Sequence, residues 1–286
     1  MQEKVLVIGG TGMLGLPVAK RLKADNFQVT ILSSHPERAR ERLGDRFDIV
    51  GGDVTRPESL RKAMDGFELV YLNLSAKRDP VLYEKIEIGG SANTAQVAHE
   101  LGIKRLITIT GASSKGEERG VVFLDAKVRA ERAIIDSGVP YTIMRASWFF
   151  ESLPHFVRGN KLTILGKQPI PRAWLAASDY AAQVSAAYRT DEAANKCFYN
   201  LGPEKITIGE AVRRYRDAHH PDKKISTLPI PLVKFVAFFT RSRTTRNTAR
   251  FFEYFDSQPE DVDASEADRM LGPNTTTLDD WLRSAR

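Results

Sequence analysis

The sequence of 286 residues has a single cysteine, Cys197, and no apolar run near the length of a membrane span. One cysteine excludes an internal disulfide and suits a reducing compartment. No basic and apolar leader precedes Val5, so we expect a cytoplasmic protein. His219 and His220 lack partners at metal-ligand spacing, and we therefore predict no metal site.

Two further classes of function lack their sequence signals. No Gly-x-Ser-x-Gly elbow occurs, which leaves hydrolase chemistry without support. The net charge is +6, but most basic residues alternate with acids, as on a solvated helix face. An acid-free cluster is formed only by Arg241, Arg243, Arg246 and Arg250. Because aromatic and basic residues do not interleave as in a nucleic-acid module, we expect no nucleic-acid partner.

A glycine-rich turn follows the first apolar segment. Residues 5–8, Val-Leu-Val-Ile, predict a strand buried on both faces, and helical spacing runs from Leu14 to Leu22. Between them, Gly9, Gly12 and Gly15 allow a tight turn and a close approach of the backbone to a ligand. Helix-start N–H groups are unpaired, so the turn favours a phosphate. The alternative is a tight turn that binds nothing.

Strand and helix patterns alternate through the first 150 residues. The sequence predicts strands at 28–32, near 47–50 and at 69–74, 105–110 and 141–145, with helical spacing from Pro36, Pro57, Tyr83, Val121 and Trp148. This alternation predicts an α/β fold, a Rossmann-type doubly wound parallel sheet with right-handed crossovers.

The second half is less regular. Short strands at 162–164 and 198–200 and a helix from Ile208 are separated by proline-marked breaks. We expect residues 1–150 to form the Rossmann core. Residues 151–286 should form a smaller C-terminal α+β substrate lobe that is interleaved with the core and is not an independent domain.

The Gly-x-x-Gly-x-x-Gly spacing resembles that of the short-chain dehydrogenase/reductase superfamily. The segments from Lys127 to Glu131, from Ser137 to Glu151 and from 177 to 181 are similar to its atypical branch of NmrA-like and isoflavone-reductase-like proteins. The likeness covers roughly the first 190 residues, and residues 277–282, with a Thr-x-x-Asp capping box, resemble the closing helix of extended members. The resemblance implies an NAD(P)-binding protein.

The end of the second strand bears on the choice of cofactor. NAD-specific sites place an acid there to hold the ribose 2′-hydroxyl, but here the first acid is Glu37, inside the expected helix. Ser33, Ser34, His35 and Arg38 suit a 2′-phosphate instead, because Arg presents a permanently charged fork. We therefore favour NADP(H) over NAD(H). The alternative is that these are only loop and helix-cap residues.

Other strand ends complete the expected cofactor site. Asp53 and Val54 resemble the superfamily's adenine-contacting loop, although Asp53 is nearly as well explained as a cap for the helix near Pro57. The loop with Leu74 and Ser75 is expected beneath the cofactor, and by similarity residues 146–149 line the nicotinamide and substrate pocket. The cofactor-binding residues implied are Gly9, Thr11, Gly12, Met13, Leu14, Gly15, Ser33, Ser34, His35, Arg38, Asp53, Val54, Leu74, Ser75, Thr110, Lys127, Ala146, Ser147 and Trp148.

The expected catalytic dyad of the superfamily is incomplete. Complete members carry Tyr and Lys four residues apart on one helix face, where the ammonium lowers the pKa of the phenol. Here Phe123 stands in place of the Tyr, while Lys127 is kept. Lys127 has three interpretations: a ribose ligand, which we favour, the proton-transfer group itself, or an ordinary surface lysine. Ser113 and Ser114 fall where the family keeps a substrate-orienting Ser, and Tyr83 is a further candidate donor.

The apolar segment 229–239 has two interpretations. The one we favour is a core or lid helix over a pocket. With the arginines that follow, the alternative is contact with an anionic membrane surface. Asp179 is expected to cap a helix.

These observations predict an NADPH-dependent reductase of a small carbonyl, quinone or enone compound, as a monomer or homodimer. The alternative is a non-catalytic NADP(H)-binding redox sensor or complex-assembly factor, which the loss of the Tyr at position 123 keeps open.

Overall fold

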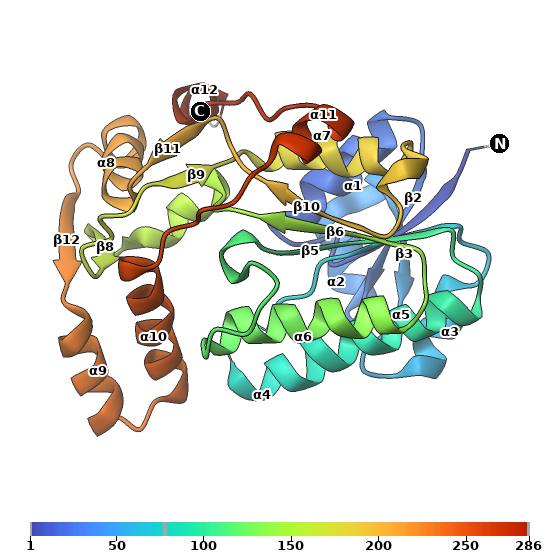
Figure 1. Cartoon of the computed structure of the whole chain (residues 1–286), viewed down its shortest axis with the longest axis horizontal. Helices are drawn as coiled ribbons and strands as arrows, with labels where there is room; N and C mark the ends of the chain where they lie inside the picture. Colours follow the sequence, from blue (N-terminus) through green and yellow to red (C-terminus); the bar gives the residue numbers. More distant parts are fainter. Residues whose placement is uncertain (1, 77–78, 285–286) are drawn as a thin grey trace.

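The structure is a computed structural model that describes residues 2–76 and 79–284, without the side chains of Pro80 and Ser114. Its centre is a seven-stranded, fully parallel sheet with the strand order β10-β6-β5-β4-β1-β2-β3 (Figure 1). The strands are β1 (Lys4–Ile8), β2 (Gln28–Ser33), β3 (Asp48–Gly51), β4 (Leu69–Leu72), β5 (Arg105–Gly111), β6 (Tyr141–Ala146) and β10 (Lys196–Asn200). The predicted doubly wound α/β fold is confirmed.

Helices cover both faces of this sheet, as in Figure 1. One face buries its apolar side chains under α1 (Gly15–Ala24), α7 (Ala177–Tyr188) and α11 (Ser265–Leu271). The opposite face packs under α3 (Pro57–Met64), α5 (Gly89–Glu100) and α6 (Val122–Asp136). The central strands β1 and β4 are near-continuous apolar runs because both of their faces are covered.

The edge strand β10 comes from the second half of the chain. It pairs in parallel with β6, with Phe198 opposite Met144, and α7 packs against α1. The short strand expected at 198–200 in the C-terminal half thus forms an edge of the Rossmann sheet. The sequence pattern showed a short apolar strand but not its partner, since the pairing joins segments far apart in the chain.

A second core lies beyond the C-terminal ends of β5 and β6. Strand β8 (Lys161–Leu165) lies between β7 (Val157–Arg158) and β12 (Lys224–Leu228), and β9 (Arg172–Trp174) pairs with β11 (Glu204–Ile206). Their apolar side chains pack with those of α8 (Ile208–His219) and α12 (Leu278–Ser284).

Local details of this half agree in part with expectation. In the predicted capping box, Asp280 N donates to Thr277 Oγ1 at 3.2 Å, and Thr277 N donates to Asp280 Oδ2 at 3.1 Å. The helix expected from Trp148 is instead a 3-10 segment, Phe150–Phe156, with a proline inside it. Asp179 does not cap α7. Its carboxylate accepts from the N–H groups of Thr275 and Thr276 and fixes the C-terminal segment.

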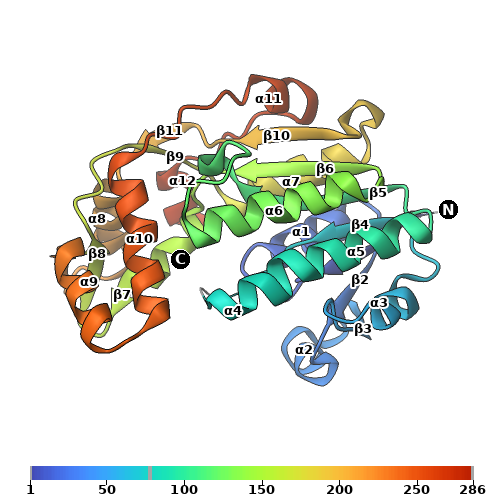
Figure 2. The ribbon, with the colours of Figure 1, turned by 60° about the horizontal axis from the view of Figure 1, so that its bottom comes forward.

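A helical hairpin, α9 (Ile230–Phe239) and α10 (Arg243–Ser257), projects from this second core (Figures 1 and 2). Its second helix runs back toward the start of α6. The remaining elements are α2 (Pro36–Leu43), α4 (Pro80–Leu82), a π-helical turn (Tyr83–Ile88) and 3-10 turns at Gly44–Arg46, Ala112–Ser114 and Asp191–Ala193. Within the described residues, no helix has the length and apolarity needed to cross a membrane.

Candidate functional site

The glycine turn between β1 and α1 has a geometry that excludes side chains. Gly9 has φ 84°, and a Cβ there would lie 2.0 Å from the Asn73 carbonyl oxygen. A Cβ on Gly15 would lie 2.2 Å from the Gly9 carbonyl oxygen, while Gly12 N donates to that same oxygen at 2.9 Å. These contacts bring the loop against the end of β4, which only glycine permits.

Backbone donors remain available at this turn. Met13 and Leu14, just before α1, donate no backbone hydrogen bond to any part of the chain that the structure describes. Arg42, on α2, donates from Nη1 to the Thr11 carbonyl oxygen at 2.8 Å and fixes the outer side of the loop. Unpaired N–H groups at a helix start, with no side chains in the way, fit a pyrophosphate. The sequence analysis did not single out Arg42.

The loop after β2 is exposed and internally hydrogen-bonded. His35 N donates to Ser33 Oγ at 3.1 Å, and Ser34 Oγ lies 3.0 Å from His35 Nδ1. Arg38 is exposed and forms no ion pair within residues 2–76 and 79–284, whereas Glu37 is paired with Arg40 at 2.6 Å. Glu37 is therefore already paired with a cation. Arg38, which has no such partner among the described residues, lies one helical turn before Arg42.

The Asp53 carboxylate is hydrogen-bonded within its own loop. Its Oδ1 accepts from the N–H and the hydroxyl of Thr55, at 2.9 and 2.8 Å, and these hydrogen bonds lower the pKa of the carboxyl. Ser59 Oγ accepts from Asp53 N at 3.1 Å. Asp53 thus fixes a turn before α3, but it does not cap that helix, whose N-cap is Arg56, so the capping alternative is wrong.

Lys127 is buried in a network that the sequence did not reveal. Its Nζ donates to Glu87 Oε2 at 2.7 Å and to the Leu74 carbonyl oxygen at 3.2 Å. Glu87 Oε1 in turn accepts from Ala76 N at 3.0 Å. The residue is 9% exposed, so Lys127 is not an ordinary surface lysine. The ion pair ties α6 to the π-helical turn that precedes α5, and the hydrogen bond to Leu74 ties α6 to the loop after β4.

The position of the missing tyrosine is surrounded by rings. Phe123 contacts the Tyr83 ring, with centroids 6.3 Å apart, and the Phe251 ring of α10, at 5.4 Å with nearly perpendicular planes. Tyr83 is 4% exposed and begins the π-helical turn. Phe123 thus stands where the superfamily has its tyrosine, and its ring is packed against the rings of Tyr83 and Phe251.

Ser113, expected to orient the substrate, and Ser147, expected to bind the cofactor, both donate a hydrogen bond to one acid of the C-terminal half. Ser113 Oγ donates to Glu260 Oε1 at 2.5 Å, and Ser147 Oγ donates to Glu260 Oε2. Glu260 is 9% exposed, and burial raises the pKa of its carboxyl. This residue was missed because nothing in its local sequence links it to strand ends more than a hundred residues earlier.

An aromatic cluster lies beside these polar groups. Trp148, at the end of β6, contacts the rings of Phe251 and Phe255 on α10 at centroid distances of 6.0 and 5.2 Å. Phe255 also packs on Val121 and Leu124 at the start of α6. Trp148, expected to line the substrate pocket, is thus packed against aromatic rings of α10.

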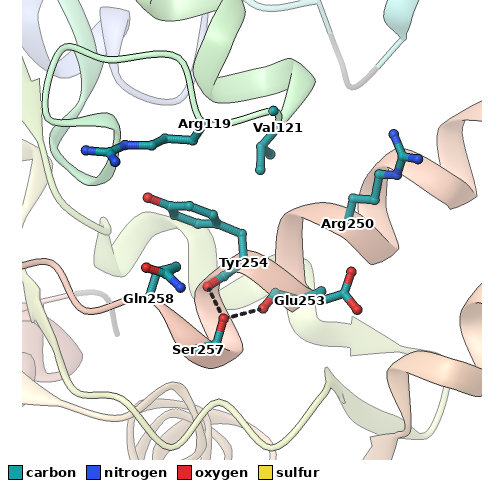
Figure 3. A pocket seen from close by; sticks show the side chains of 8 residues that line it. Arg119, Val121, Arg250, Glu253, Tyr254, Ser257 and Gln258 are labelled. Atoms are coloured by element: carbon teal, nitrogen blue, oxygen red, sulfur yellow. Dashed lines mark hydrogen bonds between the residues drawn. The ribbon is translucent and has the colours of Figure 1, made fainter.

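An open pocket of about 450 Å³ lies at the mouth of this cluster (Figure 3). One side is the loop before α6, with Arg119 and Val121, and the other is α10, with Arg250 and Tyr254. The Tyr254 hydroxyl donates to the Ser113 carbonyl oxygen at 2.9 Å, which connects the pocket wall to the serine and acid group.

The remaining motif residues have structural roles. Arg145 donates from Nη2 to Glu131 Oε2 at 2.6 Å, and Thr110 Oγ1 donates to Glu131 Oε1 at 2.5 Å. The Glu131 side chain is 3% exposed, and this network joins β5 and β6 to α6. The expected cofactor contact at Thr110 therefore has its hydroxyl engaged within the protein, and Ala146 is buried beside it. The Ser114 side chain lies outside the described residues.

Several named proteins are similar to this chain in sequence. The photosystem II assembly factor Ycf39 of Synechocystis is 24% identical, over 83% of this chain and 74% of its own. Sanguinarine reductase of Eschscholzia californica is 25% identical, over 74% of this chain and 93% of its own. An NmrA-like family domain-containing protein of Dictyostelium discoideum is 32% identical, over 56% of each chain. The resemblance to NmrA-like proteins is confirmed.

A solved structure with the same fold is the NADPH-dependent quinone oxidoreductase of Escherichia coli complexed with NADPH. It superposes with a TM-score of 0.74, at 18% identity, over 98% of this chain and 99% of that chain. The NAD(P)H-binding family matches residues 9–182, which begin at the first glycine of the turn and end within α7. The chain is therefore a member of the NAD(P)H-binding family, with the Rossmann-type fold that its glycine turn predicted.

Proposed function

We propose that the protein is an NADPH-dependent reductase of a small, partly apolar carbonyl, quinone or enone compound. The observation that carries the proposal is the meeting of Ser113, Ser147 and Glu260 beside a wall of aromatic rings, beyond the sheet edge where the glycine turn lies. In doubly wound sheets, ligands bind at the carboxyl ends of the strands. Two proteins to which the chain is similar, sanguinarine reductase and the quinone oxidoreductase, are reductases by name.

Bound NADPH would supply the hydride. The chain's own task is to hold the acceptor and supply a proton. Glu260, whose pKa burial raises, holds a proton over a wider pH range than an exposed acid. When Glu260 is protonated, the hydrogen bond between the two residues reverses, and Glu260 donates to Ser113 Oγ. The Ser113 hydroxyl is then free to donate its own proton to the substrate oxygen. Ser113 is thus the group that contacts the substrate, and Glu260 is a positioning residue and proton store.

Lys127 is proposed to bind the nicotinamide ribose. Two of its three N–H bonds are directed to Glu87 and Leu74, which leaves one for a ligand hydroxyl. Because this ammonium already binds the Glu87 carboxylate, we assign Lys127 to cofactor binding and the proton to Glu260. Tyr83, next to Phe123, is retained as a second candidate donor.

The first experiment measures NADPH oxidation against a panel of quinones, enones and aldehydes. Turnover by the parent protein supports the proposal. In Glu260→Gln we expect kcat to fall by about 100-fold, within the range for loss of a general acid, with KM little changed. The parent rate should fall as pH rises through the raised pKa of Glu260, and the variant should lack that decline. Asp261→Asn, at an exposed neighbouring acid, is the control and should behave as the parent.

A preference for NADP(H) is proposed on the free Arg38 guanidinium and the paired Glu37. Calorimetry should show that Arg38→Ala weakens NADPH binding by about tenfold, the value of one charge-assisted hydrogen bond, without changing NADH binding. Arg158→Ala removes an exposed arginine outside this loop, and it should leave the preference unchanged. Equal losses for both cofactors in Arg38→Ala would contradict the assignment.

The second candidate function is a non-catalytic NADP(H)-binding redox sensor or complex-assembly factor. It is favoured by Phe123 and by the rings of α10, which fill the space opposite the missing phenol. One relative is named a photosystem II assembly factor. Tight binding of NADPH without turnover on any acceptor, together with a protein that co-purifies in stoichiometric amount, would establish this function and reject the reductase.

A further inference from the structure

Helix α9 presents an apolar surface to solvent. Phe235, Phe238 and Phe239 are 61, 71 and 67% exposed, and Leu232 and Val236 are also exposed. Positions 232, 235, 236 and 239 lie on one face by helical spacing, while Ala237 is buried. No described residue covers this face. The expectation of a core helix is therefore wrong for this face, and the other favoured interpretation, a lid over a pocket, stays a prediction.

The chain segment that includes α9 and most of α10 carries an excess of positive charge. Residues 223–252 contain seven of the 42 Lys and Arg residues and none of the 36 Asp and Glu residues. The rest of the chain thus has 35 basic and 36 acidic residues, and is nearly neutral without this segment. Lys234 is paired with Glu253 of α10. Arg241, Arg243, Arg246 and Arg250 are exposed and form no ion pair with any described residue.

Apolar and basic groups meet at the tip of the hairpin. Phe238 and Phe239 end α9, and Arg241 and Arg243 follow within four residues, all of them exposed. The tip lies away from the parallel sheet, at the outer end of the hairpin in Figure 1.

We propose that the tip of the α9–α10 hairpin binds the surface of an anionic lipid bilayer. The phenylalanine rings enter the boundary between headgroups and acyl chains, and the arginines bind the lipid phosphates. A nucleic acid would match the arginines but would leave Leu232 and Val236 exposed to water. A bilayer surface accommodates both the charge and the apolar face.

Sedimentation with vesicles tests this proposal on the full chain. We expect binding to vesicles of phosphatidylcholine with 30% phosphatidylglycerol, weaker binding in high salt, and little binding to phosphatidylcholine alone. Arg241→Glu with Arg243→Glu should weaken binding by at least about 30-fold, at about 1 kcal/mol per cation removed. Phe238→Ser with Phe239→Ser should weaken it comparably.

Matched variants separate this site from general charge and apolarity. Lys20→Glu with Lys62→Glu makes the same change in charge on exposed residues elsewhere, and Ile135→Ser removes an exposed apolar side chain of α6. Both should bind vesicles as the parent does. All substituted positions are exposed, so the variants should keep the parent melting temperature and NADPH affinity.

Three results would overturn the proposal. The first is the absence of binding to anionic vesicles at low salt. The second is binding that the hairpin variants leave unchanged. The third is a different occupant: self-association by light scattering that Phe238→Ser with Phe239→Ser abolishes, or binding to single-stranded DNA as tight as to vesicles and unaffected by that variant.

Discussion

The proposed cofactor end and the proposed substrate end of the site are built in different ways. The cofactor end is one contiguous turn, residues 9–15, whose shape follows from glycine and from a helix start. The substrate end joins Ser113 and Ser147 to Glu260, across 147 and 113 positions of sequence, and adds rings from α10. A local turn is specified by its own residues, whereas the distant group depends on the whole fold. The substrate end is therefore the part that can diverge among relatives with the same cofactor turn.

The largest effect is expected at the buried ion pair of Glu131 and Arg145, which joins β6 to α6. Glu131→Gln leaves a largely buried guanidinium without its counter-charge, and should lower the free energy of unfolding by about 3–5 kcal/mol. Urea denaturation measures this loss. Arg132→Ala, which breaks an exposed pair with Glu118, should cost less than about 1 kcal/mol. Equal losses in the two variants would show that the buried pair has no special role.

A substitution confined to the cofactor end comes next. Gly9→Ala forces a positive φ on alanine and pushes a Cβ into the Asn73 carbonyl, at a combined cost of about 3 kcal/mol. Calorimetry should show loss of NADPH binding. Gly44→Ala also has a positive φ, 57°, but has open space around it and should keep full affinity. If Gly9→Ala binds NADPH normally, the turn does not hold the cofactor.

A substitution confined to the substrate end should spare the cofactor. Phe251→Ala removes a half-buried ring between Phe123 and Trp148, and should destabilise the protein by about 2 kcal/mol while NADPH affinity stays unchanged. It should also raise kcat/KM for bulkier quinones relative to small ones, because the ring limits the space beside Trp148. Val81→Ala, at an exposed apolar residue, is the control. A loss of NADPH affinity would show that the two ends are not separate.

The smallest effect is a change in pH dependence. Because the pKa of Glu260 is raised in the folded state, the native protein binds a proton that the unfolded chain releases first. The contribution to stability is complete below the unfolded pKa and is lost as pH rises through the folded pKa. The difference in unfolding free energy between Glu260→Gln and the parent should therefore shift in favour of the variant as pH rises from 4 to 8. A difference that is constant over this range would contradict the raised pKa.

The sequence was sufficient for the parts of the fold that depend on local pattern. The apolar strands, the glycine turn and the capping box at Thr277 each follow from residues within a few positions of one another. The partners Glu87 of Lys127 and Glu260 of Ser113 were not predictable, because a single acid in a helix or loop has no local signature of burial. The boundary near residue 150 stays a prediction.

The placement of β10 has a consequence for synthesis on the ribosome. Until residues 196–200 emerge, β6 is an unpaired edge of an otherwise assembled parallel sheet. Such an edge is a template for pairing with other chains. A nascent chain that stalls shortly before this strand is therefore the species most exposed to aggregation, and the one for which chaperone assistance matters most.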